Sequence, residues 1–299
     1  MNDPEIAALR EVLAQRERPA AIADRRRAID AMAEQMPVAR DSVFEPVTAN
    51  GVRAEWSAAP GVKQDHALLF LHGGGYVIGS LASHRHMVSE LGRAAGVRAL
   101  ALDYRLAPEH PFPAAVDDAL AGYRFLLASG FAPRRIAIAG DSAGGGLAVA
   151  AMVAIQDAGL PQPAGGWCIS PWIDLEGVGE SMTSLATVDP TVHKDVILEL
   201  AALYLNGAPA RSPLAAPIYA DLSGLAPLVI QVGAAETLLD DAVRLARVAG
   251  IANVAVTLEI WPEMIHVWHL FHPRLAPGRR AITRGGAAVR ALFDAGAAS

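Results

Sequence analysis

The sequence has one cysteine and few charged residues, and each shortage excludes a class of protein. Because Cys168 is the only cysteine among 299 residues, no disulfide can form within the chain. Proteins without disulfides are typical of reducing compartments, so we expect a cytoplasmic protein. Charged residues make up 19% of the chain and apolar residues 53%. This balance excludes intrinsic disorder, because a disordered chain has few apolar residues and many charged ones.

Long uncharged segments and runs of basic residues are also missing. The longest uncharged helical stretch, residues 142–156, is shorter than the ~20 residues that a membrane span needs. The opening MNDPEIAALR carries acids and no apolar core, so we do not expect a secretory signal. The net charge is −6, and only Arg25–Arg27 cluster, as on a solvated helix surface. We therefore expect neither a membrane nor a nucleic acid as a partner.

A regular alternation of strand-like and helix-like segments begins at about residue 66. Strands covered on both faces are apolar at consecutive positions, and alternating β and α units form a mostly parallel, doubly wound sheet. The predicted strands are residues 67–74, 97–106, 135–141, 165–172, 228–236 and 254–262, and the predicted helices are residues 83–95, 113–129, 142–158 and 240–251.

Two further segments are predicted to be helical and to have no strand partner. Residues 1–45 contain PEIAALREVLAQ and AIADRRRAIDAMAEQM, and residues 176–212 insert another helical stretch. We interpret both as a small helical cap over the carboxyl ends of the strands, where ligands bind in such sheets. The predicted organisation is an N-terminal cap segment, residues 1–45, and an α/β domain, residues 46–299, with a cap insertion at about 176–212.

The segment GDSAG, residues 140–144, places a serine between a predicted strand and a predicted helix. Gly140 and Gly144 flank Ser142 at two residues' distance, where a sharp bend brings two backbones too close for a side chain. The pattern G-x-S-x-G is that of a nucleophile elbow, which exposes the serine above the sheet. A tight turn with a helix-capping serine explains the pentapeptide alone equally well, so its surroundings decide.

The segment LHGGGY, residues 71–76, follows another predicted strand with three glycines. Peptide N–H groups there can approach a substrate without obstruction. We predict that those of Gly73 and Gly74, with that of Ala143, form an oxyanion hole. The glycines do not indicate a phosphate loop, because neither a Lys-Ser/Thr pair nor G-x-G-x-x-G accompanies them. We expect His72 to brace this loop.

A serine hydroxyl needs a base, and the base needs an acid to orient it. In the chain order Ser, acid, His that this elbow favours, the base is His266, which follows the last predicted strand. His269 and His272 have a spacing that metal ligands can have, but no carboxylate or cysteine pattern supports a metal, and we expect none. The acid is Glu236, at the end of a strand. Asp240 is the alternative, in a first helical turn where acids are favoured anyway.

Three motifs in order resemble a known family, namely HGGGY at residues 72–76, DYRLAPEHPFPAA at 103–115 and GDSAGG at 140–145. The chain is similar over residues 68–271 to the hormone-sensitive-lipase-like esterases, bacterial family IV of the α/β-hydrolases. It departs from the family at the acid, where Glu236-Thr237-Leu238 replaces the commoner Asp-Pro-Leu, and after His266, where Val-Trp replaces Gly-Phe.

The resemblance implies an α/β-hydrolase fold, a helical cap and hydrolysis of short-to-medium-chain acyl esters through an acyl-enzyme. It also implies Ser142 as nucleophile, His266 as base, and Gly73, Gly74 and Ala143 as oxyanion donors. We expect a small-molecule ester substrate and no cofactor. Two alternatives stay open: a non-catalytic small-molecule-binding protein on the same fold, and a deacetylase or amidase that acts on a metabolite.

Four large residues are candidates for the substrate-binding wall: Tyr76, Trp172, Tyr204 and Leu205. Packing within the core or the cap explains each of them equally well. The last predicted strand, residues 254–262, is expected to form an edge of the sheet. Pairing of this edge between two copies would give a homodimer, as in relatives that this chain resembles.

Overall fold

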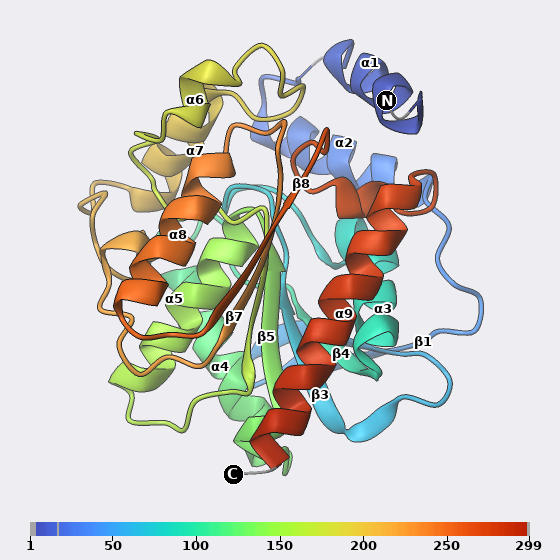
Figure 1. Ribbon diagram of the computed structural model, residues 1–299, viewed down its shortest axis with the longest axis vertical. Coiled ribbons are helices and arrows are strands. Elements are labelled where there is room, and N and C mark those ends of the chain that lie inside the picture. Colours follow the sequence, from blue (N-terminus) through green and yellow to red (C-terminus); the bar gives the residue numbers. More distant parts are fainter. Residues whose placement is uncertain (1–3, 17, 298–299) are drawn as a thin grey trace.

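The computed structural model describes residues 4–16 and 18–297, so residues 1–3 and 17 of the predicted cap segment, and residues 298–299, lie outside the described residues. Within the described ranges the chain forms an eight-stranded sheet between layers of helices (Figure 1). The strands are β1 (Val43–Ala49), β2 (Val52–Ala58), β3 (Lys63–Leu71), β4 (Val97–Leu102), β5 (Ile136–Asp141), β6 (Gly165–Ile169), β7 (Leu228–Gly233) and β8 (Val256–Trp261).

The sheet is parallel over most of its width. Its strand order is β1-β2-β4-β3-β5-β6-β7-β8. Neighbouring strands from β4 to β8 in this order run parallel, whereas β2 runs antiparallel to both β1 and β4. The predicted mostly parallel, doubly wound sheet is confirmed, and β8 lies at one edge, as expected from the sequence.

Helices cover both faces of the sheet, which explains the continuous apolar runs. On one face lie α3 (Leu81–Ala95) and α9 (Ala276–Ala297), and on the other α4 (Ala114–Ala128), α5 (Ala143–Asp157) and α8 (Leu239–Ile251) (Figure 1). Successive side chains of a strand point to opposite faces. Accordingly, Leu68 and Phe70 of β3 pack in the core under α3 and α9, while Leu69 and Leu71 pack in the core under α5.

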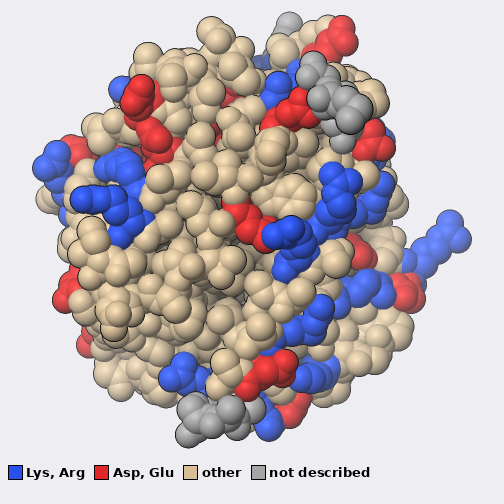
Figure 2. All heavy atoms as spheres, in the orientation of Figure 1, with Lys and Arg blue, Asp and Glu red and all other residues tan. Residues whose placement is uncertain are grey.

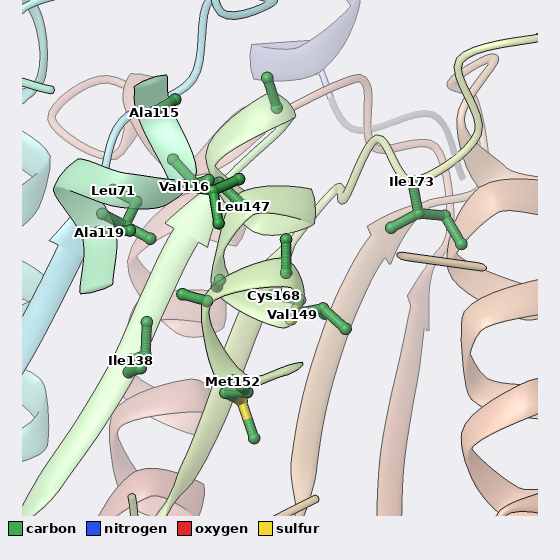
Figure 3. Packing of buried hydrophobic residues seen from close by; sticks show 14 of the residues in the cluster. Leu71, Ala115, Val116, Ala119, Ile138, Leu147, Val149, Met152, Cys168 and Ile173 are labelled. Carbon is green, nitrogen blue, oxygen red and sulfur yellow. The ribbon is translucent and has the colours of Figure 1, made fainter. Parts of the chain in front are cut away.

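The core between the sheet and α5 fixes the helix that follows the predicted elbow. Figure 3 shows Leu71 of β3 and Ile138 of β5 together with Leu147 and Met152 of α5. All four side chains are fully buried, and burial of each such side chain stabilises the fold by about 1.5–3 kcal/mol. The start of α5 is therefore held firmly against the carboxyl ends of β3 and β5.

Two parts of the fold were not predicted from the sequence. β1 and β2 form a hairpin whose turn, Asn50-Gly51, has φ angles of 48° and 92°, and Asn-Gly is a strong signal for such a turn. Because β1 begins at Val43, the predicted boundary at residue 45 falls inside a strand.

In α9, which was also not predicted, adjacent glycines weaken the helical signal. Packing nevertheless requires one of them, because a Cβ at Gly285 would lie 2.0 Å from the Trp167 ring.

Several predicted strands extend too far at their carboxyl ends. β4 ends at Leu102, β6 at Ile169 and β7 at Gly233, each before the predicted end. Beyond β6 and β7 the chain stays mostly buried but leaves the sheet, so hydrophobicity alone does not mark where strand pairing stops. These departures matter, because the loops that follow the strands carry the site residues.

The helices of the two predicted cap segments gather at one end of the molecule (Figure 1). They are α1 (Pro4–Ala14), α2 (Ile22–Glu34), α6 (Ser181–Ser184) and α7 (Lys194–Leu205). Arg26 attaches α2 to the rest of the chain, because its guanidinium donates to the carbonyls of Val77 and Ala107 and pairs with Glu109. The division of the chain into cap and α/β domain stays a prediction.

The surface mixes both signs of charge. On the face drawn in Figure 2, Lys and Arg are interspersed with Asp and Glu. In the molecule as a whole, ion pairs such as Arg93–Asp41 and Arg284–Glu259 join side chains of opposite charge. Short 3₁₀ helices occur at η1 (Pro133–Arg135), η2 (Pro217–Tyr219) and η3 (Trp268–Phe271).

Within the described part of the chain, no helix combines the length and the apolarity that a membrane span requires.

Candidate active site

Ser142 lies in a strained turn between β5 and α5. Its φ and ψ are 56° and −124°, a conformation that few residues other than glycine adopt and that costs about 1–3 kcal/mol. A Cβ at Gly140 would lie 2.1 Å from the Gly144 carbonyl oxygen, and one at Gly144 would lie 2.0 Å from the Leu71 carbonyl oxygen. The close approach of three backbone segments therefore requires glycine on both sides of the serine.

The structure brings Ser142, His266 and Glu236 together from three loops at the carboxyl ends of the strands. The His266 Nε2 atom lies 2.9 Å from the Ser142 Oγ atom. On the other side of the ring, Nδ1 has a long contact of 3.5 Å with the Glu236 Oε1 atom. The Glu236 side chain is fully buried, and that of His266 is 10% exposed.

Burial and mutual attraction oppose each other in this pair. Burial alone would lower the pKa of His266, but the neighbouring Glu236 carboxylate raises it above the ordinary histidine value. Burial raises the pKa of Glu236, and the hydrogen bonds from His266 and Ser170 work against that rise. An imidazolium formed at His266 would therefore be stabilised by a carboxylate that water does not screen.

The other candidate acids and histidines have different partners. Asp240, the alternative acid, accepts the Ser181 N–H at 2.8 Å. His269 is fully buried against the Gln231 amide oxygen at 3.0 Å, and burial lowers its pKa to about 3. His272 stacks on His86. Among the described residues, no group of three or more His, Cys, Asp or Glu side chains is arranged to hold a metal ion.

The glycine loop after β3 differs in one respect from the sequence prediction. The Gly73 N–H already donates to the Asp141 Oδ1 atom at 3.0 Å, so it is not free to stabilise an oxyanion. The residues of this loop that line the cavity around Ser142 are Gly74 and Gly75. Ala143 is the first residue of α5, where a backbone N–H has no partner within the helix. The predicted oxyanion donors, Gly73, Gly74 and Ala143, stay a prediction, and only the Gly73 N–H is engaged by a carboxylate.

Buried polar groups support this loop from behind. Tyr104 donates its hydroxyl proton to the His72 carbonyl at 2.7 Å and stacks on the His72 ring. This contact and burial of the ring agree with the expectation that His72 braces the loop, and burial lowers its pKa to about 4. The Asp141 Oδ2 atom lies 3.4 Å from the His84 Nε2 atom. Burial would raise the pKa of Asp141, but the nearby histidines lower it.

Ser142 and His266 line a cavity of about 290 Å³ beneath the cap helices. Its walls are largely apolar, and Trp172 is one of the lining residues, with 2% of its surface exposed. The apolar side chains from the cap include Ile29 and Met32 of α2 and Val196, Ile197 and Leu200 of α7. An uncharged group next to the Ser142 hydroxyl would therefore be removed from water by the cap.

Tyr76, Tyr204 and Leu205, which were candidates for the substrate-binding wall, are not among the residues that line this cavity. The Tyr76 and Tyr204 rings stack on each other, with centroids 3.8 Å apart, and both are buried. Tyr76 lies in the glycine loop and Tyr204 near the end of α7, so the stacked rings join the cap to the loop. In a sequence, large aromatic residues near a predicted site therefore indicate internal packing as readily as contact with a ligand.

Residues 68–270 match the model of a protein family described as having the alpha/beta hydrolase fold. The chain belongs to this α/β-hydrolase family. An acetyl-hydrolase from Streptomyces hygroscopicus is 51% identical over 250 residues, covering 84% of this chain and 83% of that protein. Carboxylesterase NlhH from Mycobacterium tuberculosis is 32% identical, covering 84% of this chain and 81% of that protein.

A solved structure is similar to this α/β-hydrolase over nearly its whole length. The crystal structure of an esterase from the bacterial hormone-sensitive lipase family has a TM-score of 0.96 and 50% sequence identity, covering 98% of this chain and 99% of that chain. The resemblance seen in the three sequence motifs is confirmed, and so is the α/β-hydrolase fold.

Sequence reasoning missed several polar residues around the site of this α/β-hydrolase. Asp141 lies inside the GDSAGG motif, yet its contact with Gly73 depends on a strand-to-strand neighbour that spacing does not reveal. Ser170 follows β6 as an ordinary serine before a proline, but it is fully buried at a φ of 44°. A buried serine with positive φ is visible only in the structure.

Proposed function

We propose that this α/β-hydrolase is a carboxylester hydrolase that works through an acyl-enzyme on Ser142. The observation that carries the proposal is the 2.9 Å contact between the His266 Nε2 atom and the Ser142 Oγ atom at the cavity floor. A hydroxyl is activated when a base lies within hydrogen-bond distance of it and an acid orients that base. The names of the relatives, acetyl-hydrolase and carboxylesterase, support ester or acetyl-group hydrolysis.

In the first half of the reaction, Ser142 attacks the ester carbonyl carbon while His266 Nε2 accepts the hydroxyl proton. The Nδ1 proton of His266 points toward Glu236, which fixes the tautomer and stabilises the imidazolium. His266 then gives its proton to the leaving alcohol oxygen, and the acyl group stays on Ser142. In the second half, His266 takes a proton from water as the water oxygen attacks the acyl carbon. His266 then returns this proton to the Ser142 oxygen as its bond to the acyl carbon breaks and the carboxylic acid leaves.

The tetrahedral intermediate carries a negative oxygen that needs donors in a cavity shielded from water. We assign this role to the N–H groups of Gly74, Gly75 and Ala143, because the Gly73 N–H is engaged by Asp141. The positive end of the α5 helix dipole adds to their effect. Loss of one such donor typically costs about 2.7–4 kcal/mol of transition-state stabilisation.

The cavity supports a small, apolar acyl or alcohol group on the substrate. Its volume is about 290 Å³, and its cap side is lined mainly by apolar residues, together with Arg16, Arg18 and Arg25. The acetyl-hydrolase name of the Streptomyces relative favours acetyl as the acyl group, so removal of acetyl from a metabolite oxygen or nitrogen is the second candidate. Comparison of an acetate ester with the matching acetamide separates the two, because an amidase cleaves both and an esterase only the ester.

The proposal is tested by rapid mixing of the protein with excess p-nitrophenyl butyrate. A burst of one p-nitrophenol per active chain followed by steady turnover is expected when deacylation is slower than acylation. Steady turnover without a burst also agrees, provided that Ser142→Ala removes it. A folded protein that binds the ester but releases no p-nitrophenol would instead be the non-catalytic binding protein.

We also propose a homodimer formed through β8, which lies at a free edge of the sheet. Its Ile260 side chain is 46% exposed, and an exposed edge strand presents unpaired backbone donors and acceptors. Light scattering should give twice the chain mass, and a monomeric mass at micromolar concentration would contradict this assembly.

A further inference from the structure

A buried hydroxyl connects the Glu236 carboxylate with the backbone next to His266. Ser170 directly follows β6, its side chain is fully buried, and its φ is 44°. Its backbone N–H donates to the Gln231 carbonyl of β7 at 2.7 Å. The serine is thus held in a strained conformation by the sheet itself, which a plain loop would not require.

The hydrogen bonds of Ser170 have a defined direction. A hydroxyl has one proton to donate and two lone pairs that accept. The Val267 N–H can only donate, and it does so to the Ser170 Oγ atom at 3.1 Å. The hydroxyl proton is therefore available to Glu236, whose Oε2 atom lies 2.8 Å from the Ser170 Oγ atom.

The two partners of this hydroxyl are the acid and the backbone next to the base. The Oε2 atom of Glu236 also accepts the Gly233 N–H at 3.2 Å, which leaves Oε1 facing His266. Val267, which follows His266 in the chain, has a φ of 47°, a rare conformation for a β-branched residue. The Ser170 hydroxyl thus supports a strained turn that sets the position of the imidazole.

We propose that Ser170 is a positioning residue for ester hydrolysis, whose hydroxyl holds the Glu236 carboxylate and the backbone that carries His266 in a fixed relation. This inference rests on the proposed function. Ser170 does not line the cavity, and it acts through Glu236, which orients the base, and through the backbone next to His266, which transfers the proton. Without the hydroxyl, Glu236 loses a donor and the Val267 N–H is buried without a partner.

The test compares Ser170→Ala with Ser89→Ala. Ser89 is also buried, but its hydroxyl donates only to the His86 carbonyl of its own helix, at 3.0 Å. Ser170→Ala should lower kcat by roughly 10- to 100-fold with KM nearly unchanged, because a hydrogen bond to a charged group is lost at the base rather than at the substrate. Ser89→Ala should keep the kcat of the unaltered protein. A wild-type kcat in folded Ser170→Ala would overturn the proposal.

A double-mutant cycle shows whether Ser170 acts through the acid. In a Glu236→Ala background, Ser170→Ala should lower kcat by less than about threefold, since residues that act as a unit are not additive. A further loss as large as in the unaltered protein would mean that Ser170 only supports the fold, and would overturn the proposal. If Ser170→Ala does not fold, Ser170→Cys replaces it, because a thiol is a weak donor of similar shape. Ser170→Cys should then lose roughly tenfold in kcat, and a wild-type kcat would overturn the proposal.

The proposed function and this inference fail in different ways. If Ser142→Ala keeps its turnover, the esterase mechanism is wrong and Ser170 has nothing to position. If Ser142→Ala is inactive while Ser170→Ala matches the unaltered protein, the mechanism stands and only the role of Ser170 is wrong.

Discussion

The nucleophile and the base reach the cavity by different physical means. At the elbow, backbone fixes Ser142, because Gly140, Gly144 and the end of β3 approach within distances that exclude any side chain. At the acid–base corner, side-chain hydrogen bonds fix His266 and Glu236 through Ser170. Substitutions of the elbow glycines should therefore lower the stability of the fold. Substitutions around His266 and Glu236 should instead lower the rate of proton transfer in a protein that still folds.

Removal of the nucleophile gives the largest expected effect. Ser142→Ala should lower kcat for p-nitrophenyl butyrate by roughly 10⁶-fold, because in the described part of the chain the Ser142 hydroxyl alone lies against His266 Nε2. The alanine also fits the turn without new contacts, so the melting temperature should change little. A loss of less than tenfold, measured in protein freed of contaminating esterase, would contradict Ser142 as the nucleophile.

Removal of the negative charge behind the base comes next. Glu236→Gln keeps the shape of the side chain but lacks the charge that stabilises the imidazolium, and we expect a loss of roughly 10⁴-fold in kcat. The matched control is Asp240→Asn, whose carboxylate bonds to Ser181 and not to His266. Asp240→Asn should stay within about tenfold of the unaltered protein. The reverse ranking of the two variants would make Asp240 the acid.

The dependence of the reaction on pH follows from the same pair. His266 must be neutral to accept the Ser142 proton, and the Glu236 carboxylate raises its pKa above the ordinary value of 6.5. A raised pKa keeps the base protonated to higher pH, so kcat/KM should fall as the pH drops through an apparent pKa above 6.5 that belongs to the pair. Glu236→Gln should move the fall in kcat/KM to lower pH. A profile that is flat down to pH 5 would contradict the proposed base.

A glycine substitution at the elbow tests the other half of the comparison. A Cβ at Gly144 would lie 2.0 Å from the Leu71 carbonyl oxygen, whereas a Cβ at Gly250 in α8 meets nothing within 4 Å. Gly144→Ala should therefore cost at least about 3 kcal/mol of unfolding free energy, while Gly250→Ala should add about 0.5–1 kcal/mol. Urea unfolding measures both. Equal midpoints for the two variants would mean that the elbow tolerates a side chain.

The smallest effect is expected in the cap. Val196 of α7 lines the cavity and is partly exposed, so Val196→Trp should narrow the space for long acyl chains. We expect kcat/KM for an octanoate ester, relative to the acetate ester, to fall by roughly tenfold, since each methylene in an apolar pocket is worth about 1–3 kcal/mol. An unchanged ratio would place the acyl chain away from α7.

The same comparison explains what could be predicted from the sequence. Backbone contact at the elbow leaves a signature, because only glycine fits at residues 140 and 144, and the serine could be located from it. The acid–base corner has no such signature. His266 and Glu236 were found from chain order, whereas Ser170 depends on β6 and β7 lying side by side, which only the sheet order reveals.

The oxyanion donors also show what the sequence alone could not predict, and the residue concerned is Gly73. Three consecutive glycines predict a loop with free N–H groups, but they do not tell which N–H points to the cavity. The carboxylate of Asp141 engages the first of them, and this contact joins the ends of two parallel strands. The β1–β2 hairpin, in contrast, has a local Asn50-Gly51 signal and could have been predicted.

The most direct test of the central claim is the site of covalent labelling by a fluorophosphonate, which mimics the charged tetrahedral intermediate. Digestion and mass spectrometry of the labelled protein should place one phosphonyl group per chain on Ser142, with slower labelling in His266→Ala. A folded protein that stays unlabelled, or that carries the label on another residue, would contradict activation of Ser142 by His266.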